Sequence, residues 1–176
     1  MNIMKSVFYV FVLTLFSSMT FAQTGFHKYG VGAEVGIPMG NFGNAYGIGF
    51  GATGKVFYGL NEKSDITGTL GYMRFGMKKD NDMMSGSMGM IPIVFGYRYD
   101  FGGLYGEPQL GFTVLKSKIN FDDMGLGLSG LSGTGSTTKF SLGLGGGYDF
   151  GSLDVGARFQ IIDNLNFLGL RLGFNF

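Results

Sequence analysis

Strict alternation of bulky apolar residues with small or polar ones is the feature that most constrains the fold of this chain. In residues 30–37 every odd position is apolar and every even position is glycine or glutamate. Because successive side chains of a β-strand point to opposite faces, such a segment predicts a strand with one apolar face and one small, polar face. The pattern recurs in eight segments, residues 30–37, 47–58, 65–75, 89–99, 104–115, 138–150, 153–161 and 166–176.

The contrast between the two faces favours a membrane barrel over a soluble one. The chain contains 34 glycines, and 16% of its residues are aromatic. A soluble barrel of the lipocalin type would bury the bulky face and leave a surface made largely of glycine, whereas a membrane barrel turns the bulky face to lipid. No segment after residue 22 has the ~18 consecutive apolar residues of a membrane-spanning helix. The sequence therefore predicts an all-β fold, an eight-stranded antiparallel up-and-down transmembrane β-barrel.

The predicted connections are mostly short at one end of the barrel and longer at the other. This is the arrangement of outer-membrane barrels, in which the short turns face the periplasm. The tetrapeptide Tyr-Asp-Phe-Gly occurs twice, at residues 99–102 and 148–151, each time where a strand reaches a short turn. Outward-facing aromatic residues gather at the same strand ends, and aromatic girdles mark the membrane interface. We expect the girdle to contain Tyr58, Tyr97, Tyr99, Tyr148, Phe150 and Phe174.

The first 22 residues have the organisation of a secretory signal peptide. Lys5 provides a positive charge, residues 7–16 form an apolar run, and Ala22 ends a cleavage site with small side chains. The run is too short to span a membrane as a helix. We therefore expect residues 1–22 to be removed during export and residues 23–176 to form one barrel domain in the outer membrane of a Gram-negative bacterium.

Three stretches of the sequence resemble the small outer-membrane β-barrel family of Bacteroidetes-type bacteria, which is related in architecture to OmpA- and OmpX-type barrels. They are residues 30–43, the Ile91-Pro92-Ile93 segment of the fourth predicted strand, and the ending 170–176. The resemblance implies the same barrel and, through Phe174 and Phe176, an assembly signal for the barrel-assembly machinery. It implies no single function, because such barrels carry several activities.

The polar faces of the predicted strands place charged residues in a narrow lumen. An eight-stranded barrel is only wide enough inside for side chains, and isolated buried charges are costly, so opposite charges must pair there. We expect a structural network of ion pairs, with a gated or narrow ion path as the alternative. Its expected members are Glu34, Lys55, Arg98, Glu107, Lys139, Asp154, Arg158 and Arg171.

The sequence offers little for catalysis, metals or cofactors. The single histidine, His27, lies before the first predicted strand, on the periplasmic side and away from outer-leaflet substrates. Asp122 and Asp123 supply two carboxylates where a calcium cage needs six or more oxygens, and the methionines of residues 73–90 suit apolar filling better than copper(I) binding. The glycine-rich stretch 125–130 lacks the βαβ context of a dinucleotide site. We therefore expect no enzyme activity, no metal and no cofactor, and no basic surface for nucleic acid.

Basic residues at the loop ends of several predicted strands are candidates for contact with lipopolysaccharide phosphates, or else for ordinary snorkelling. They are Arg74, Lys78, Lys79, Lys116 and Lys118. The sequence as a whole predicts a non-enzymatic barrel with an envelope-structural or surface-interaction role through its extracellular loops, where function is commonly carried. The alternative is a narrow channel for ions or small apolar solutes. The expected partners are outer-membrane lipid, lipopolysaccharide and, during biogenesis, the barrel-assembly machinery.

Overall fold

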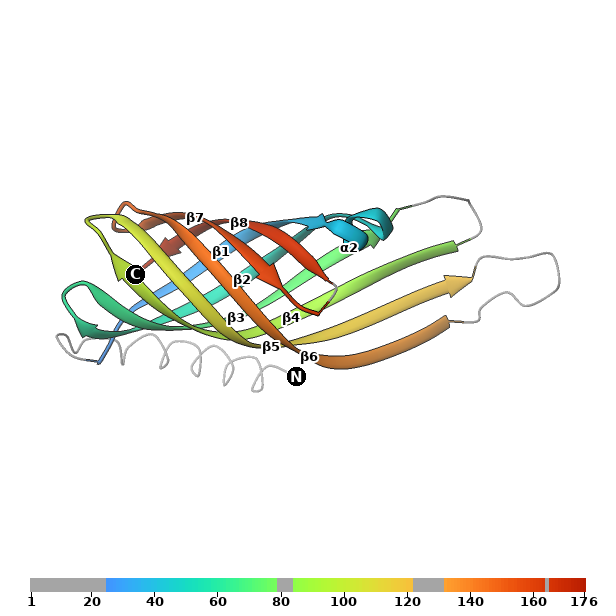
Figure 1. The fold of residues 1–176 in the computed structure, drawn as a ribbon, viewed down its shortest axis with the longest axis horizontal. Helices are drawn as coiled ribbons and strands as arrows, with labels where there is room; N and C mark the ends of the chain where they lie inside the picture. Colours follow the sequence, from blue (N-terminus) through green and yellow to red (C-terminus); the bar gives the residue numbers. More distant parts are fainter. Residues whose placement is uncertain (1–24, 79–83, 122–131, 164) are drawn as a thin grey trace, which may run out of the picture.

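The computed structural model describes residues 25–78, 84–121, 132–163 and 165–176, and the predicted signal peptide lies outside them. Eight antiparallel strands form a closed barrel (Figure 1). Each strand pairs with its neighbours in sequence, and the last strand pairs with the first. The predicted fold class is thereby confirmed. No helix of the described residues is long and apolar enough to cross a membrane. The elements are β1 (Gly25–Met39), α2 (Gly40–Ala45), β2 (Tyr46–Asn61), β3 (Ser64–Met77), β4 (Met84–Asp100), β5 (Leu104–Phe121), β6 (Ser132–Asp149), β7 (Leu153–Ile161) and β8 (Asn166–Asn175).

The seam between β1 and β8 closes the sheet. Their register runs from Gly30 opposite Asn175 to Met39 opposite Asn166. The C-terminal residue extends the seam, because Phe176 exchanges backbone hydrogen bonds with Tyr29 in both directions, at 3.0 and 2.8 Å. Every backbone group must find a partner inside a membrane, and a closed ladder provides that partner along all eight strands.

Small residues line parts of the lumen because the adjacent strand is close. A Cβ atom on Gly111 would meet the backbone of Ile93 and Val94, and a Cβ on Gly51 would meet the backbone of Tyr72. At these inward-facing positions the adjacent strand leaves no room for a Cβ atom, so glycine is required.

Several strands are longer than the alternation predicts, above all at the loop end of the barrel. The predicted connections 76–88 and 116–137 are partly strand, since β4 begins at Met84, β5 ends at Phe121 and β6 begins at Ser132. These parts of β4, β5 and β6 run on past α2 and project beyond the rest of the barrel (Figure 1). Lipid imposes an apolar outer face only within the membrane, so strand segments above it keep no clear alternation.

The two copies of Tyr-Asp-Phe-Gly form the same turn, between β4 and β5 and between β6 and β7. Asp100 Oδ1 accepts a hydrogen bond from the Gly102 N–H at 2.6 Å, and Asp149 Oδ1 accepts one from Gly151 at 2.8 Å. Both glycines have positive φ, 101° and 91°, which side-chain-bearing residues rarely adopt. In each turn the tyrosine and phenylalanine rings also contact one another, with centroids 4.8 and 4.6 Å apart.

The Asp100 turn gives a pH-dependent contribution to stability. Hydrogen bonds from the N–H groups of Gly103 and Gly102 lower the pKa of this carboxyl, which lies outside the membrane-spanning part. A lowered folded-state pKa means that the stabilisation is complete above the unfolded pKa of about 4 and is lost as the pH falls through the folded value. Asp100→Asn keeps an oxygen acceptor but cannot titrate.

We therefore expect Asp100→Asn to lose less stability than the wild type on acidification below about pH 4. Urea unfolding, followed by heat-modifiable gel mobility at each pH, measures the difference. Glu62→Gln, in the exposed turn between β2 and β3, is the matched control and should follow the wild-type profile. Parallel acid profiles for wild type and Asp100→Asn would contradict the assignment.

Candidate functional site

Charged side chains fill the turn-end half of the lumen and are paired. Lys55 Nζ lies 2.7 Å from Glu107 Oε2, with the two side chains only 5% and 1% exposed. Glu107 also accepts hydrogen bonds from Thr67 Oγ1 and Gln109 Nε2, each at 2.7 Å. A second pair joins Arg158 Nε to Glu34 Oε1 at 2.8 Å.

A larger cluster is centred on Asp154, which is fully buried. Its two oxygens lie 2.9 Å from Arg98 Nη1 and 2.7 Å from Arg171 Nη1. Arg98 also binds Asp149 through Nη2 at 2.9 Å, and Lys28 contacts the same Asp149 oxygen. We call the paired residues together the charge layer: Lys28, Glu34, Lys55, Arg98, Glu107, Asp149, Asp154, Arg158 and Arg171.

The structure brings together most, but not all, of the predicted lumen charges. The prediction was wrong for Lys139, whose amine is exposed and pairs with Asp163 at 3.1 Å. The register explains this, because β7 ends at Ile161 opposite Leu142, and position 139 lies beyond the wall that β7 forms. Sequence reasoning missed Lys28 and Asp149, which occupy strand ends outside or at the limit of the alternating segments.

An apolar plug fills the lumen at the loop end, and the sequence analysis missed it. Phe42, from α2, packs against Phe75 with ring centroids 5.1 Å apart, and Phe75 contacts Phe167 at 5.6 Å. Met73 and Phe75 lie on the same inward face of β3 as Thr67 and Thr69. The inward face therefore changes from polar to apolar along the strand, a signal that the sequence carries. The plug consists of Phe42, Met73, Phe75, Met90, Leu115, Ile162 and Phe167, none more than 6% exposed.

The charge layer and the apolar plug lie one after the other along the lumen. A cavity of about 30 Å³ lies between Lys55, Tyr105, Glu107, Arg158 and Arg171. Such a volume holds about two water molecules. Cations within the charge layer are held further by aromatic rings, since the Arg98 guanidinium lies 3.5 Å from the centroid of Tyr105.

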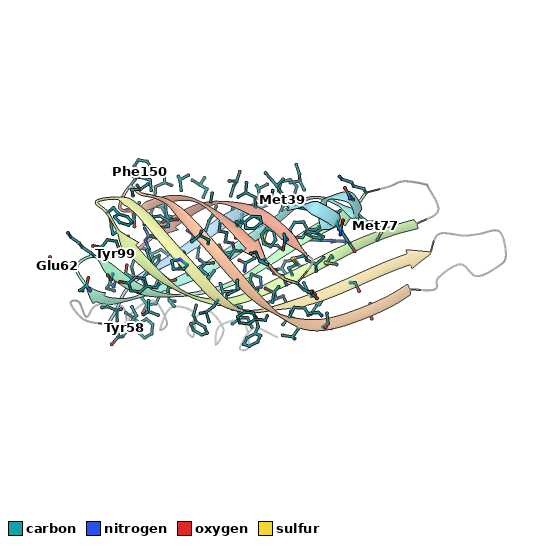
Figure 2. The ribbon with its side chains drawn as sticks, in the orientation of Figure 1. Met39, Tyr58, Glu62, Met77, Tyr99 and Phe150 are labelled. Atoms are coloured by element: carbon teal, nitrogen blue, oxygen red, sulfur yellow. The ribbon has the colours of Figure 1, made fainter. Side chains whose placement is uncertain are left out.

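The residues expected in the aromatic girdle lie on the outer surface near the turn end. Tyr58, Tyr99 and Phe150 are seen there in Figure 2, at the opposite end from Met39 and Met77. Phe150 is 64% and Phe174 54% exposed in the absence of lipid. Their assignment to the membrane interface stays a prediction, as does the assembly signal at Phe174 and Phe176.

The basic residues at the loop end divide into three groups. Arg74, Lys116 and Lys118 point outward and are exposed. Lys78 instead donates a hydrogen bond to the Gly43 carbonyl at 2.5 Å and so fastens α2 to the end of β3. Lys79 lies outside the described residues.

Acidic and histidine side chains form no cluster of three or more that would hold a metal, within the ranges the structure describes. His27 lies in β1 at the turn end, 3.5 Å from Asp65. The pair Asp122 and Asp123 falls outside the described residues.

The charge layer predicts a strong effect of Glu107→Gln on stability. Removing this carboxylate leaves Lys55 buried without its counter-charge, and breaking one partner of a buried pair typically costs about 3–5 kcal/mol. We expect a correspondingly lower urea midpoint in detergent. Lys55→Met combined with Glu107→Gln removes both charges and should recover part of the loss. An unchanged midpoint for Glu107→Gln alone would show that the pair is not structural.

The family model of the outer membrane protein beta-barrel domain matches residues 8–176. No curated protein matches the chain. The structure resembles Ail, the attachment invasion locus protein of Yersinia pestis (TM-score 0.63, 16% identity, 88% of this chain and 100% of Ail covered).

Two further barrels have the same fold. Neisserial surface protein A has a TM-score of 0.55 and 18% identity, with 84% of this chain and 94% of that one covered. The N-terminal barrel of Pseudomonas aeruginosa OprF has a TM-score of 0.54 and 18% identity, with 86% and 99% covered. At such identities the likeness extends to the fold, whereas the family match extends over nearly the whole sequence. This chain belongs to the outer membrane protein beta-barrel domain family.

Proposed function

We propose that this protein is a non-enzymatic surface-interaction barrel, in which a closed membrane-spanning part supports the projecting ends of β4, β5 and β6. The observation that carries the proposal is an unpaired strand edge. β6 pairs with β5 from Ser132 onward but with β7 only from Leu142. Within the described residues, positions 132–141 therefore have a neighbour on one side only. We call this segment the β6 edge.

An unpaired edge is a template for another strand, because its backbone N–H and C=O groups lie open. Proteins usually protect such edges with charges, prolines or bulges. The β6 edge has none of these from Gly133 to Thr138, and all six residues are exposed. The occupant that fits is an extended segment of a partner at the cell surface, held mainly by backbone hydrogen bonds.

The fold relatives are consistent with a role at the surface. Ail is described as an attachment invasion locus protein, and one of its structures contains the heparin analogue sucrose octasulfate. For this chain we propose two further partners, the barrel-assembly machinery during biogenesis and lipopolysaccharide in the outer leaflet. The position of the single histidine supports a non-enzymatic role, since His27 lies at the turn end and not near the extracellular loops.

Transport of ions or small apolar solutes is the alternative function, and conductance distinguishes it. The charge layer and the apolar plug lie in series along the lumen, so we expect the refolded protein to be silent in a planar bilayer. Heat-modifiable mobility of the same sample shows that the barrel is folded. Steady channels that change with Arg158→Gln would favour transport and contradict the closed lumen.

A pair of proline variants tests the β6 edge. Adjacent residues of a strand direct their N–H groups to opposite sides, so of Ser136→Pro and Thr137→Pro one removes a donor to β5 and the other a donor at the open edge. The probe is a peptide with the sequence of residues 115–120, the segment of β5 that pairs with the other side of β6. We expect the variant that loses the donor at the open edge to keep wild-type stability. It should bind the peptide about fivefold more weakly, because one hydrogen bond is lost. Equal peptide binding by wild type and both variants would contradict the proposal.

A further inference from the structure

The outward face of the barrel at the loop end carries three cations in adjacent rows. The register places Arg74 opposite Gly89, Gly89 opposite Lys116, and Lys116 opposite Ser136. The next row outward consists of Gly76, Ser87, Lys118 and Thr134. Because residues two apart on a strand share a face, both rows lie on the same side of the sheet. We call these eight residues the cationic face.

The cationic face contains no carboxylate to neutralise it. Arg74, Lys116 and Lys118 form no ion pair with any described residue, and Arg74 Nη2 instead donates to Ser87 Oγ at 3.3 Å. In the charge layer every cation is paired. The difference indicates that the counter-charge for the cationic face comes from outside the part of the chain that the structure describes.

Tyr72 indicates the height of this face relative to the membrane. Its ring lies over Gly89, with the hydroxyl oxygen 3.1 Å and ring carbon Cε2 3.2 Å from where a Cβ on Gly89 would stand. Tyrosine rings with an apolar body and a polar tip settle at the membrane–water interface. Below this level the same outward face is apolar, with exposed Leu70, Ile93, Phe112 and Phe140.

The geometry points to a binding site for the phosphorylated sugar headgroup of an outer-leaflet glycolipid, the lipid A part of lipopolysaccharide. Arg74 and Lys116 are two strands apart, so about 10 Å separates their backbones, room for more than one phosphate. Serine and threonine hydroxyls of the two rows face the same space and suit sugar hydroxyls. The space beside Gly76 is open, because a Cβ atom added to this residue would meet no other atom within 4 Å. The acyl chains lie against the apolar face below.

This inference rests on the proposed lipopolysaccharide partner and specifies its site. The cationic face shares Thr134 and Ser136 with the β6 edge, but it uses their side chains, whereas the edge uses their backbone groups. Lys78 and Lys79 are not part of the cationic face. The first is committed to Gly43, and the second lies outside the described residues.

The test is binding of fluorescent lipid A, carrying both phosphates, to the refolded full chain in an uncharged detergent. A cation near an anionic headgroup contributes about 1 kcal/mol, so Lys116→Gln should weaken binding about fivefold and the triple variant of Arg74, Lys116 and Lys118 to Gln about a hundredfold. Lys116→Arg should retain binding. The matched control is Lys63→Gln, an exposed lysine at the turn end, which should bind as the wild type does.

Two further arms separate the lipid from its phosphate. Dephosphorylated lipid A should bind wild type and triple variant equally weakly, and inorganic phosphate should bind far more weakly than the lipid. Heat-modifiable mobility checks that every variant is folded. Wild-type affinity in the folded triple variant, or inorganic phosphate bound as tightly as lipid A, would overturn the inference.

Discussion

Closure of the backbone hydrogen-bond ladder is the constraint on which the rest of this structure depends. Inside a membrane no water replaces a missing partner, so an open sheet edge would cost several kcal/mol for each unpaired group. The β1–β8 seam removes that edge, and the exchange between Tyr29 and Phe176 continues it to the end of the chain. Closing eight strands in turn fixes a narrow interior, which explains why inward positions such as Gly51 and Gly111 have no space for a side chain.

A narrow interior determines what the lumen contains. Charges enter it only in hydrogen-bonded pairs, and Asp154, shared by Arg98 and Arg171, shows how one carboxylate neutralises cations from two strands. Burial by itself makes such pairs costly, so their presence is weak evidence for added stability. Their arrangement does specify register, because a shift of one residue would turn each member of the charge layer to the lipid face. The apolar plug needs no such pairing and ends the lumen where α2 folds inward.

Much of the fold followed from the alternation in the sequence, because lipid on one side and a narrow lumen on the other select opposite kinds of residue. The closure, the strand order and the inward position of Glu34, Lys55, Arg98, Glu107, Arg158 and Arg171 follow from that selection. Beyond the membrane the selection ends. Residues 132–137 were therefore predicted as a loop although they form strand, and Lys139 was assigned to a lumen that β7 no longer encloses. Phe42 could not be placed at all, since its burial depends on how a six-residue helix folds over the barrel.

The same boundary explains why an unpaired edge and an unpaired cationic face occur together at the loop end. Within the membrane both would be penalised, the edge by lost hydrogen bonds and the cations by lost hydration. Above the Tyr72 ring, water satisfies both, so they persist without a partner and remain open to one. The two differ in what they select. A backbone edge such as 133–138 recognises an extended strand of almost any sequence, whereas Arg74, Lys116 and Lys118 recognise negative charge at one height. A barrel held by its cations at the headgroup level would present the β6 edge at a fixed distance above the membrane, which converts a lipid contact into a geometric constraint on the surface partner.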